Sequence, residues 1–330
     1  MNRWLSAFAL CLLLLIAAAV VSAQSEATPT AAPSKTPSAA SEALPSATPA
    51  AASVSFPLTQ ADLVRLTANV QRPNGLGWFE SKLYTACTGD GTVYEIDDTT
   101  GATRTYIYGI RNAHTLHVEE DANGGIVLWV PDYGANTLAQ VTRNGVRTII
   151  SGLRGPWGIV ALDESRFLLT NLLGNTLNVV DRAGTNTVAV PDLAAPTGLF
   201  VDEDIVYVAN TGSTRRAIEW YPLEDVVSGE FERTDAVSQV LVSGLQNTTG
   251  VQLGSDGFLY FAYALGTRGV VGRVDPEACR EAGGCTNEQV EIVLYTDLAA
   301  PLAGLVVTPD LRLFVHEMFS PDMYWLSLVG

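Results

Sequence analysis

Basic residues are scarce in this sequence, and lysine above all. Nineteen Lys and Arg stand against 35 Asp and Glu, which gives a formal net charge of −16 and an isoelectric point near 4.5. Lys35 and Lys82 are the only lysines, so nearly all positive charge is arginine. A strongly acidic chain is repelled by phosphate backbones and by anionic lipid surfaces. We therefore expect no nucleic-acid partner, and membrane contact only if the N-terminal segment is kept as an anchor.

Cysteine is also rare, and its spacing argues against a cysteine metal site. Cys279 and Cys285 bracket a short glycine-containing loop with no histidine or further cysteine near it. In an oxidising compartment the expected state of this pair is a disulfide, and the alternative is two free thiols. Cys87 has no evident partner and is expected to be a buried, free thiol.

The N-terminal segment has the pattern of an export signal. Arg3 precedes an apolar run from Leu5 to Val20, and the run ends at Val21-Ser22-Ala23, small residues typical of a cleavage site. Residues 1–23 are thus predicted to be a signal peptide; the alternative is an uncleaved anchor. Residues 24–56 are rich in Ala, Ser, Thr and Pro, and are predicted to be a disordered stalk. Both features predict a secreted or extracytoplasmic protein.

No amphipathic helical pattern of useful length occurs after residue 57, and a repeat of β-type segments takes its place. A small residue followed by a hydrophobic one recurs at Gly75, Thr115, Gly158, Gly198, Gly250 and Gly304. The steps between these positions are 40, 43, 40, 52 and 54 residues. Four-stranded propeller blades have about this period. The two longer steps require insertions, which 224–236 and the loop between Cys279 and Cys285 supply.

A second run of each repeat is apolar on both faces, as expected when each blade lies between two others. These runs are 83–85, 128–130, 167–169, 206–208, 259–261 and 313–315. The sixth repeat ends after three strands, so its outer strand is predicted to come from residues 62–70, ahead of the first repeat. The sequence therefore predicts an all-β, six-bladed propeller over residues 57–330, with four-stranded blades and a ring closed by this N-terminal strand.

The run from Val206 to Gly212 (VYVANTG) resembles the blade signature of NHL-type propellers. The whole repeat region resembles the wider six-bladed, TolB-like group, which includes the gluconolactonase/regucalcin, strictosidine-synthase-like and virginiamycin-B-lyase-like families. These families share blades and differ in chemistry, so the resemblance implies the fold and leaves the function open.

Two columns of residues are expected to surround one mouth of the central channel, which is the default ligand site in such a ring. The first column lies just before the inner-strand small residue: Asn74, His114, Trp157, Thr197, Thr249 and Ala303. The second column ends the second strand: Cys87, Asp132, Asn171, Asn210, Tyr263 and Glu317. Of these we take Asn74, Trp157, Asn171, Asn210 and Tyr263 as candidate ligand-binding residues.

Each candidate also has a structural explanation. Asp132, Asn171 and Asn210 are residue types that cap turns, because their side chains bond nearby backbone groups. His114 could bond a neighbouring carbonyl, Glu317 could form a salt bridge, and Trp157 could pack in the core. His117 is expected to be structural. His316 should point away from Glu317 by strand alternation.

Two classes of function remain open at this stage. One is a metal-dependent hydrolase or lactonase, or a lyase, in which Asp132, Asn171, Asn210 and Glu317 hold a divalent cation such as calcium. His114, Asp132 and Glu317 would then be the catalytic groups. The resemblance to gluconolactonases implies a Glu, an Asn and an Asp at the axis, but only Asn74 fits, and no first-column residue is Glu. The other class is a monomeric binding propeller whose partner is a small molecule, an extracellular protein or a glycan.

Overall fold

The structure is a computed structural model that describes residues 54–228 and 239–329, all within one compact unit of the chain. The predicted signal peptide and nearly all of the predicted stalk lie outside the described residues, as does part of the 224–236 insertion. Within the described ranges, no helix has the length and apolar character needed to cross a membrane.

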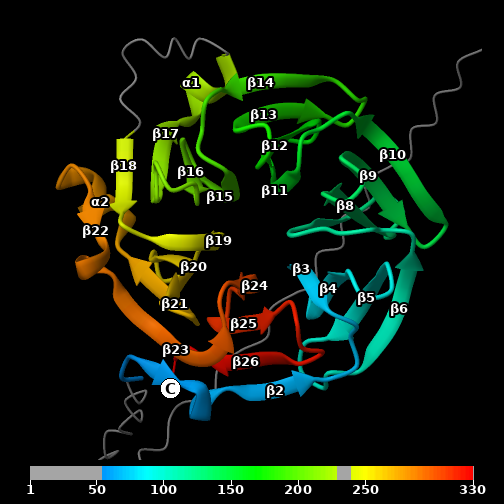
Figure 1. Ribbon diagram of the computed structural model, residues 1–330. Helices are drawn as coiled ribbons and strands as arrows, with labels where there is room; N and C mark the ends of the chain where they lie inside the picture. The colour runs from blue at the N-terminus through cyan, green and yellow to red at the C-terminus, as the bar shows by residue number, and fades with distance from the viewer. Residues whose placement is uncertain (1–53, 229–238, 330) are drawn as a thin grey trace, which may run out of the picture. The chain divides into compact units, whose positions relative to one another are not determined.

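Six antiparallel sheets stand around a central axis as the blades of a propeller (Figure 1). In each blade the chain passes from an inner strand beside the axis to an outer strand. The first three blades are β3 (Pro73–Phe79), β4 (Lys82–Cys87), β5 (Thr92–Asp97) and β6 (Thr103–Tyr108); β7 (His117–Glu120), β8 (Ile126–Asp132), β9 (Thr137–Thr142) and β10 (Gly145–Ser151); and β11 (Pro156–Ala161), β12 (Arg166–Asn171), β13 (Thr176–Asp181) and β14 (Asn186–Val190).

The sheets of the other three blades each contain one strand from elsewhere in the chain in addition to their own strands. Blade 4 is β15 (Pro196–Asp202), β16 (Ile205–Asn210), β17 (Ala217–Pro222) and β18 (Gln239–Ser243); blade 5 is β19 (Gln246–Leu253), β20 (Leu259–Leu265), β21 (Arg268–Val274) and β23 (Glu291–Ala299); blade 6 is β24 (Leu302–Val307), β25 (Arg312–Glu317), β26 (Met323–Ser327) and β2 (Val64–Thr67). Strand β1 (Leu58–Thr59) adds to β23 in parallel, and the short helix η1 (Gln60–Asp62) leads into β2.

The second strands form the core between blades, as the sequence predicts. Tyr84, Leu128, Phe167, Tyr207 and Phe314 are almost fully buried. Because each blade packs against two neighbours, a side chain on either face of these strands leaves water. The aromatic and β-branched content of the second runs is therefore a direct consequence of the architecture.

Ring closure by the N-terminal strand is confirmed. Strand β2 pairs antiparallel with β26, with Val64 opposite Trp325 and Arg65 opposite Tyr324. The last blade thus takes three strands from the end of the chain and its outer strand from the start. This pairing covers an edge of β26 that would otherwise be open to other chains.

Blade 2 departs from the repeat. Its inner strand begins only at His117, and the chain before it makes a single bridge from Ala113 to Asp132. Thr115 takes the place of the glycine in the other blades, and its hydroxyl donates to the Trp157 carbonyl at 2.7 Å. The Thr115 side chain therefore bonds blade 2 to blade 3 at the position where the hydrogen-bond ladder within blade 2 is interrupted.

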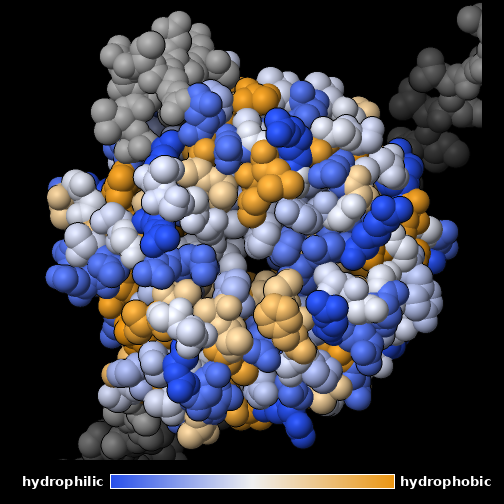
Figure 2. Space-filling model, in the orientation of Figure 1, coloured by the Kyte–Doolittle hydropathy of each residue, from blue (hydrophilic) through white to orange (hydrophobic). Residues whose placement is uncertain are grey.

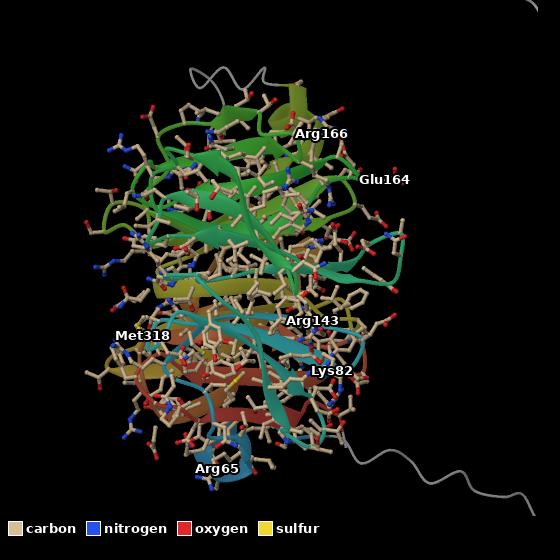
Figure 3. All side chains as sticks on the ribbon, turned by 90° about the vertical axis from the view of Figure 1, so that its right-hand side faces the viewer. Arg65, Lys82, Arg143, Glu164, Arg166 and Met318 are labelled. Carbon is tan, nitrogen blue, oxygen red and sulfur yellow. A yellow bond between two sulfur atoms is a disulfide. The ribbon has the colours of Figure 1, made fainter. Side chains whose placement is uncertain are left out.

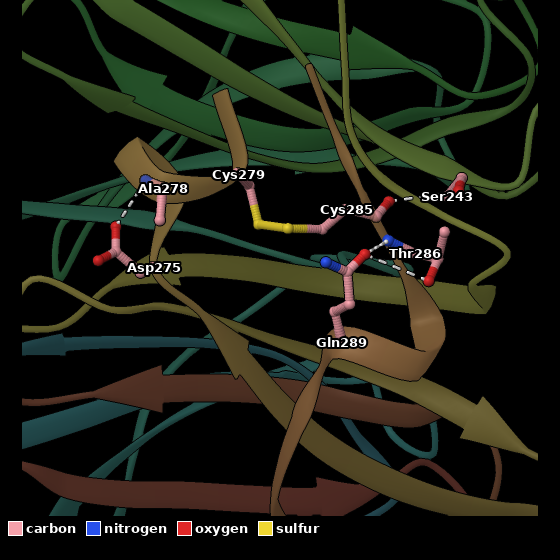
Figure 4. The surroundings of a disulfide bond; sticks show 7 residues. All are labelled: Ser243, Asp275, Ala278, Cys279, Cys285, Thr286 and Gln289. Carbon is pink, nitrogen blue, oxygen red and sulfur yellow. Dashed lines mark hydrogen bonds between the residues drawn. A yellow bond between two sulfur atoms is a disulfide. The ribbon is translucent and has the colours of Figure 1, made fainter. Parts of the chain in front are cut away.

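Cys279 and Cys285 form the predicted disulfide, and Cys87 is free and buried. The disulfide joins helix α2 (Pro276–Glu281) to β22 (Cys285–Thr286), which pairs in parallel with β18 of the neighbouring blade (Figure 4). Asp275 caps α2 by accepting from the Ala278 amide at 3.0 Å. This insertion therefore extends blade 5 across the outer edge of blade 4. Helix η2 (Asn287–Gln289) then leads back to β23, and helix α1 (Leu223–Ser228) begins the other insertion.

Ion pairs fasten the seams between blades. Arg143 of blade 2 pairs with Glu95 of blade 1, and Arg182 of blade 3 pairs with Glu119 of blade 2. The Arg312 guanidinium of blade 6 lies 2.8 Å from the Asp98 carboxylate of blade 1. Each of these three arginines thus links two neighbouring blades through an ion pair.

Candidate functional site

The candidate residues lie at one end of the ring, which we call the crossover end because each outer strand crosses there to the next inner strand. The turns that follow the second strands lie at the same end. Figure 3, a side view, shows Met318 at the crossover end and Lys82, Glu164 and Arg166 at the opposite end. Figure 2 looks onto the crossover end and shows hydrophobic side chains in small patches among hydrophilic ones. Leu173, Leu265 and Phe319 are exposed in or beside the turns at this end.

The polar residues that end the second strands hold the crossovers in place. Asp132 accepts hydrogen bonds from the backbone amides of Arg111 at 2.8 Å, Asn112 at 3.1 Å and Ala135 at 3.0 Å. Asn171 accepts from the Arg154 amide, Asn210 from the Ala194 amide and Glu317 from the Ala299 amide. The same bond thus recurs in four blades, and it gives these four side chains a structural role.

Glycines complete this arrangement and explain the NHL-like signature. Gly212, two residues after Asn210, lies so close to Ala194 that an added Cβ would meet it at 3.0 Å. Gly134 is placed in the same way against Arg111, and Gly174 against Arg154. An Asn or Asp followed by such a glycine therefore clamps the turn of a blade to its own crossover.

Residues of the first column are less exposed than expected for side chains at a channel mouth. Asn74, Thr197 and Thr249 are buried. The Thr197 hydroxyl donates to the Thr248 carbonyl, and the Thr249 hydroxyl to the Leu302 carbonyl, so both tie neighbouring inner strands together. The Asn74 amide donates to the Asn112 side chain, which the sequence analysis did not single out.

An aromatic cluster spans the seam between blades 2 and 3. The rings of His114 and Trp157 stack with centroids 3.4 Å apart and planes 5° apart, and Tyr133 meets both edge-on. Burial lowers the pKa of His114 to about 3, so the imidazole is neutral at physiological pH. Trp157 keeps part of its surface exposed. Tyr133 was missed because nothing in its local sequence marks it.

Unpartnered polar atoms gather at the crossover end. Seven buried side-chain nitrogen or oxygen atoms among the described residues have no hydrogen-bond partner. Five of them lie near the crossover ends of inner or second strands: Asn74 Oδ1, Trp157 Nε1, Asn210 Nδ2, Thr248 Oγ1 and His316 Nε2. A buried polar group without a partner is costly, and such groups mark places that water or a ligand completes.

His117 and Tyr263 have structural roles in the fold, and His316 is buried with its Nε2 unpartnered. His316 is fully buried behind the inner strand of blade 6, where its Nε2 would lie 2.4 Å from a Cβ on Gly304. His117 faces Glu119, which Arg182 also binds, so it belongs to a seam. Tyr263, a predicted ligand residue, is buried and packs against Phe261 with ring centroids 5.7 Å apart.

The predicted metal ligands do not form a carboxylate-rich cluster. Among the described residues, no group of three or more His, Cys, Asp or Glu side chains is arranged to hold a metal ion. Asp132 and Glu317 each use a carboxylate oxygen to accept backbone amide hydrogens. The residues present therefore fit a calcium site poorly, since such sites take six to eight oxygen ligands. Calcium binding remains a prediction of the sequence.

A cavity of about 630 Å³ follows the channel toward the opposite end. All six blades contribute to its wall, for example through Leu76, Thr115, Ile159, Leu199, Val251 and Leu305. It reaches Asp202 at the end of β15, and Glu203 and Ser255 in the turns after the inner strands. This cavity was not predicted from the sequence. None of the residues lining it has an unpartnered buried polar atom.

Comparisons with known proteins agree on the fold. No family model matches the sequence, and no curated protein matches it significantly. A gluconolactonase from Xanthomonas campestris is similar in structure, with a TM-score of 0.59 and 15% identity over 81% of this chain and 89% of that one. A catalytically inactive virginiamycin B lyase from Staphylococcus aureus, solved with quinupristin, has a TM-score of 0.52 and 16% identity over 77% of this chain and 81% of that one. A streptogramin B lyase has a TM-score of 0.50 and 14% identity over 81% and 97%. At these identities the similarity shows the propeller fold and extends no further.

Proposed function

We propose that this protein is an extracytoplasmic propeller that binds a small organic ligand at the crossover end, around Trp157. The observation that carries the proposal is that five of the seven unpartnered buried polar atoms among the described residues lie toward the crossover end, and that one of them is Nε1 of Trp157 itself. They include donors on Trp157 and Asn210 and an acceptor on Asn74. A ligand that enters between the crossovers, directly or through water, gives these atoms the partners that the fold does not supply.

The aromatic cluster supports the same location. The Trp157 ring is supported by His114 and Tyr133 and is partly exposed, so it offers a rigid apolar surface beside the polar atoms. Ligand sites commonly combine an apolar wall with a few placed polar groups. The channel cavity also has polar residues in its lining, but none of them has an unpartnered buried polar atom.

The extracytoplasmic location is supported by two features of the chain. The apolar run before Val21-Ser22-Ala23 has the pattern of a cleaved signal, and the disulfide between Cys279 and Cys285 is the kind of bond that persists in oxidising compartments. An enzymatic role as a hydrolase, lactonase or lyase would need the cation site whose test is described in the Discussion.

An aromatic probe tests the proposed site. N-phenyl-1-naphthylamine is uncharged and fluoresces when it leaves water, so we expect saturable binding at one site per chain. Trp157→Leu should weaken this binding at least tenfold, because it removes the ring that the probe would contact. Trp325→Leu is the matched control, since Trp325 is a partly exposed tryptophan in β26 of blade 6 and not in the blades of the aromatic cluster. Equal binding to the native protein and to the Trp157→Leu variant would refute the proposed site.

A further inference from the structure

We infer that the ligand at the crossover end is an organic anion, a planar molecule with a carboxylate, phosphate or sulfonate group that Arg72, Arg111 and Arg154 bind. The inference rests on the proposed function and adds the chemical class of the ligand. It starts from a recurrence in the chain: Arg72 lies two residues before Asn74, Arg111 three before His114, and Arg154 three before Trp157. Three successive crossovers thus bring an exposed arginine to the start of an inner strand.

The arginines occupy one sector of the mouth. Arg111 and Arg154 are the residues whose amides the second-strand caps Asp132 and Asn171 accept. At the equivalent positions of blades 4 and 6, the caps accept from Ala194 and Ala299. The crossovers of blades 1 to 3 are therefore cationic, whereas those of blades 4 and 6 carry alanine at this position.

The backbone that carries each arginine is fixed. The Asp132 carboxylate lies 2.8 Å from the Arg111 amide nitrogen, and Asn171 Oδ1 lies 3.2 Å from that of Arg154. The carbonyl of Arg72 accepts from the Thr88 amide at 3.0 Å. Because the crossover backbone is already held by these hydrogen bonds, ligand binding costs little additional backbone entropy.

Arg72, Arg111 and Arg154 also lack the ion pairs that other arginines make. Arg143, Arg182 and Arg312 are bound to carboxylates across the blade seams. In the described part of the chain, no ion pair joins Arg72, Arg111, Arg154 or the nearby Arg216 to a carboxylate. The acids of the same end have other partners: Asp132 bonds to three amides, Asp90 accepts from the Thr92 amide and the Tyr94 hydroxyl, and Asp297 pairs with Arg268.

Charge is polarised along the axis of the ring. Every turn between an inner and a second strand, at the end opposite the crossovers, carries at least one acid: Glu80, Asp121, Asp163, Glu203, Asp256 and Asp310. Three of these acids pair with arginines of the same end, Asp163 with Arg166, Asp256 with Arg273 and Asp310 with Arg312. In the described part of the chain the other three form no ion pair, and they repel an anion from the end to which the channel cavity extends. The free arginines attract it to the crossover end, even though the whole chain is acidic.

The cationic sector coincides with the aromatic one. The stacked pair His114 and Trp157 belongs to blades 2 and 3, and the unpartnered oxygen of Asn74 to blade 1. Since His114 is neutral, the positive charge of this sector comes from arginine alone. A planar body on Trp157 with an oxyanion toward the arginines uses both features, and the guanidinium group favours oxyanions because its donors form a planar fork.

Two fluorescent probes that differ only in a sulfonate group distinguish the contribution of charge to binding from the contribution of the aromatic rings. 8-Anilino-1-naphthalenesulfonate has the ring system of N-phenyl-1-naphthylamine with an added sulfonate. We expect the sulfonate to bind the native protein at least tenfold more tightly than the uncharged probe at about 0.05 M salt, and this advantage to shrink at about 0.5 M salt by screening. Arg111→Gln and Arg154→Gln should each weaken sulfonate binding about threefold to tenfold, and Arg72→Gln should act in the same direction.

The uncharged probe and a remote arginine supply the controls. Binding of N-phenyl-1-naphthylamine should stay within about twofold in all three variants, and Arg166→Gln, at the opposite end, should leave both probes unaffected. Equal affinity of the two probes, or sulfonate binding that the three arginine variants do not weaken, would overturn the inference. If Trp157→Leu still abolished binding of the uncharged probe, the proposed site would stand while the anion inference failed. If Trp157→Leu changed neither probe, the proposed function itself would fail.

Discussion

His114 and Trp157 stack across the seam between blades 2 and 3, with ring centroids 3.4 Å apart and planes 5° apart. The two residues are 43 positions apart in the sequence and occupy equivalent places in successive repeats. The stack therefore joins two blades at the point where the inner strand of blade 2 has not yet begun. It serves both the packing of this seam and the proposed ligand surface.

The first prediction concerns the energy of this contact. His114→Ala and Trp157→Ala should each lower the free energy of unfolding, and the double variant should lose about 1 kcal/mol less than the sum of the single losses. Urea denaturation of the four proteins measures this coupling. Additive losses would mean that the stack contributes nothing beyond burial.

The second prediction concerns pH. Burial lowers the pKa of His114 to about 3, from an ordinary value near 6.5 in the unfolded chain. Between these values the unfolded chain binds the proton and the folded protein does not, so acidification favours unfolding. His114 should thus contribute a stability loss approaching about 1.4 kcal/mol per pH unit once the pH is below 6. His114→Phe keeps an aromatic ring and should reduce this slope in unfolding curves between pH 4 and 6. An unchanged slope would show that His114 titrates normally in the folded state.

The third prediction concerns the disulfide. Cys279 and Cys285 are six residues apart and tie α2 to the strand that pairs with β18. Because so short a loop restricts the unfolded chain only modestly, the double variant Cys279→Ser, Cys285→Ser should lose about 2 kcal/mol of stability. A reductant should lower the melting temperature of the native protein and leave that of the variant unchanged. Mapping by mass spectrometry should show Cys87 unlinked, and a bond from Cys87 to either residue would contradict the structure.

The fourth prediction concerns ring closure. A chain that starts at Gly75 lacks β2 and should fold poorly or aggregate, because the edge of β26 is then uncovered. A chain that starts at Phe56 retains the latch strand and should melt like the full mature protein. Light scattering and thermal melts of the two proteins check this, and equal behaviour would rule out a stabilising role for β2.

The fifth prediction concerns calcium. A calcium titration tests the ligand set that the sequence suggests: if those side chains hold calcium, the melting temperature should rise by mass action, by an amount that grows with the logarithm of the calcium concentration. Asp132→Asn and Glu317→Gln should reduce the calcium-induced shift, and Asn123→Ala, on an exposed turn, should not. Because Asp132 and Glu317 accept hydrogen bonds from crossover amides, both variants should also have a lower melting temperature without calcium. The quantity to compare is therefore the change in melting temperature that calcium causes in each protein. Absence of a shift with any divalent ion would leave the metal-dependent hydrolase without support.

The fold could be predicted from the sequence because the information is local and repeated. Each blade has a small residue in or just before its inner strand, an apolar second strand and polar turns, and this pattern occurs six times in the chain. The missing fourth strand of the last blade pointed to residues 62–70, and β2 lies within that range. The disulfide followed from its short loop and the absence of other partners.

What a side chain at the mouth contacts was decided by the tertiary structure alone. Strand position predicted that Asp132, Asn171, Asn210 and Glu317 lie at one end, but each carboxylate or amide oxygen meets a crossover amide about 16 to 21 residues away in the chain. The residue types of Asp132, Asn171 and Asn210 suggested that they bond backbone groups, but because those amides are brought there by the path of the crossover, no local pattern identified the amides that they bond. Within the described part of the chain, the same path leaves Arg72, Arg111 and Arg154 without ion pairs and Asn74 and Trp157 with unpartnered atoms. The sequence thus determined the ring and which side chains lie at its crossover end, and the packing of crossovers against turns decided which polar groups there already have partners within the protein.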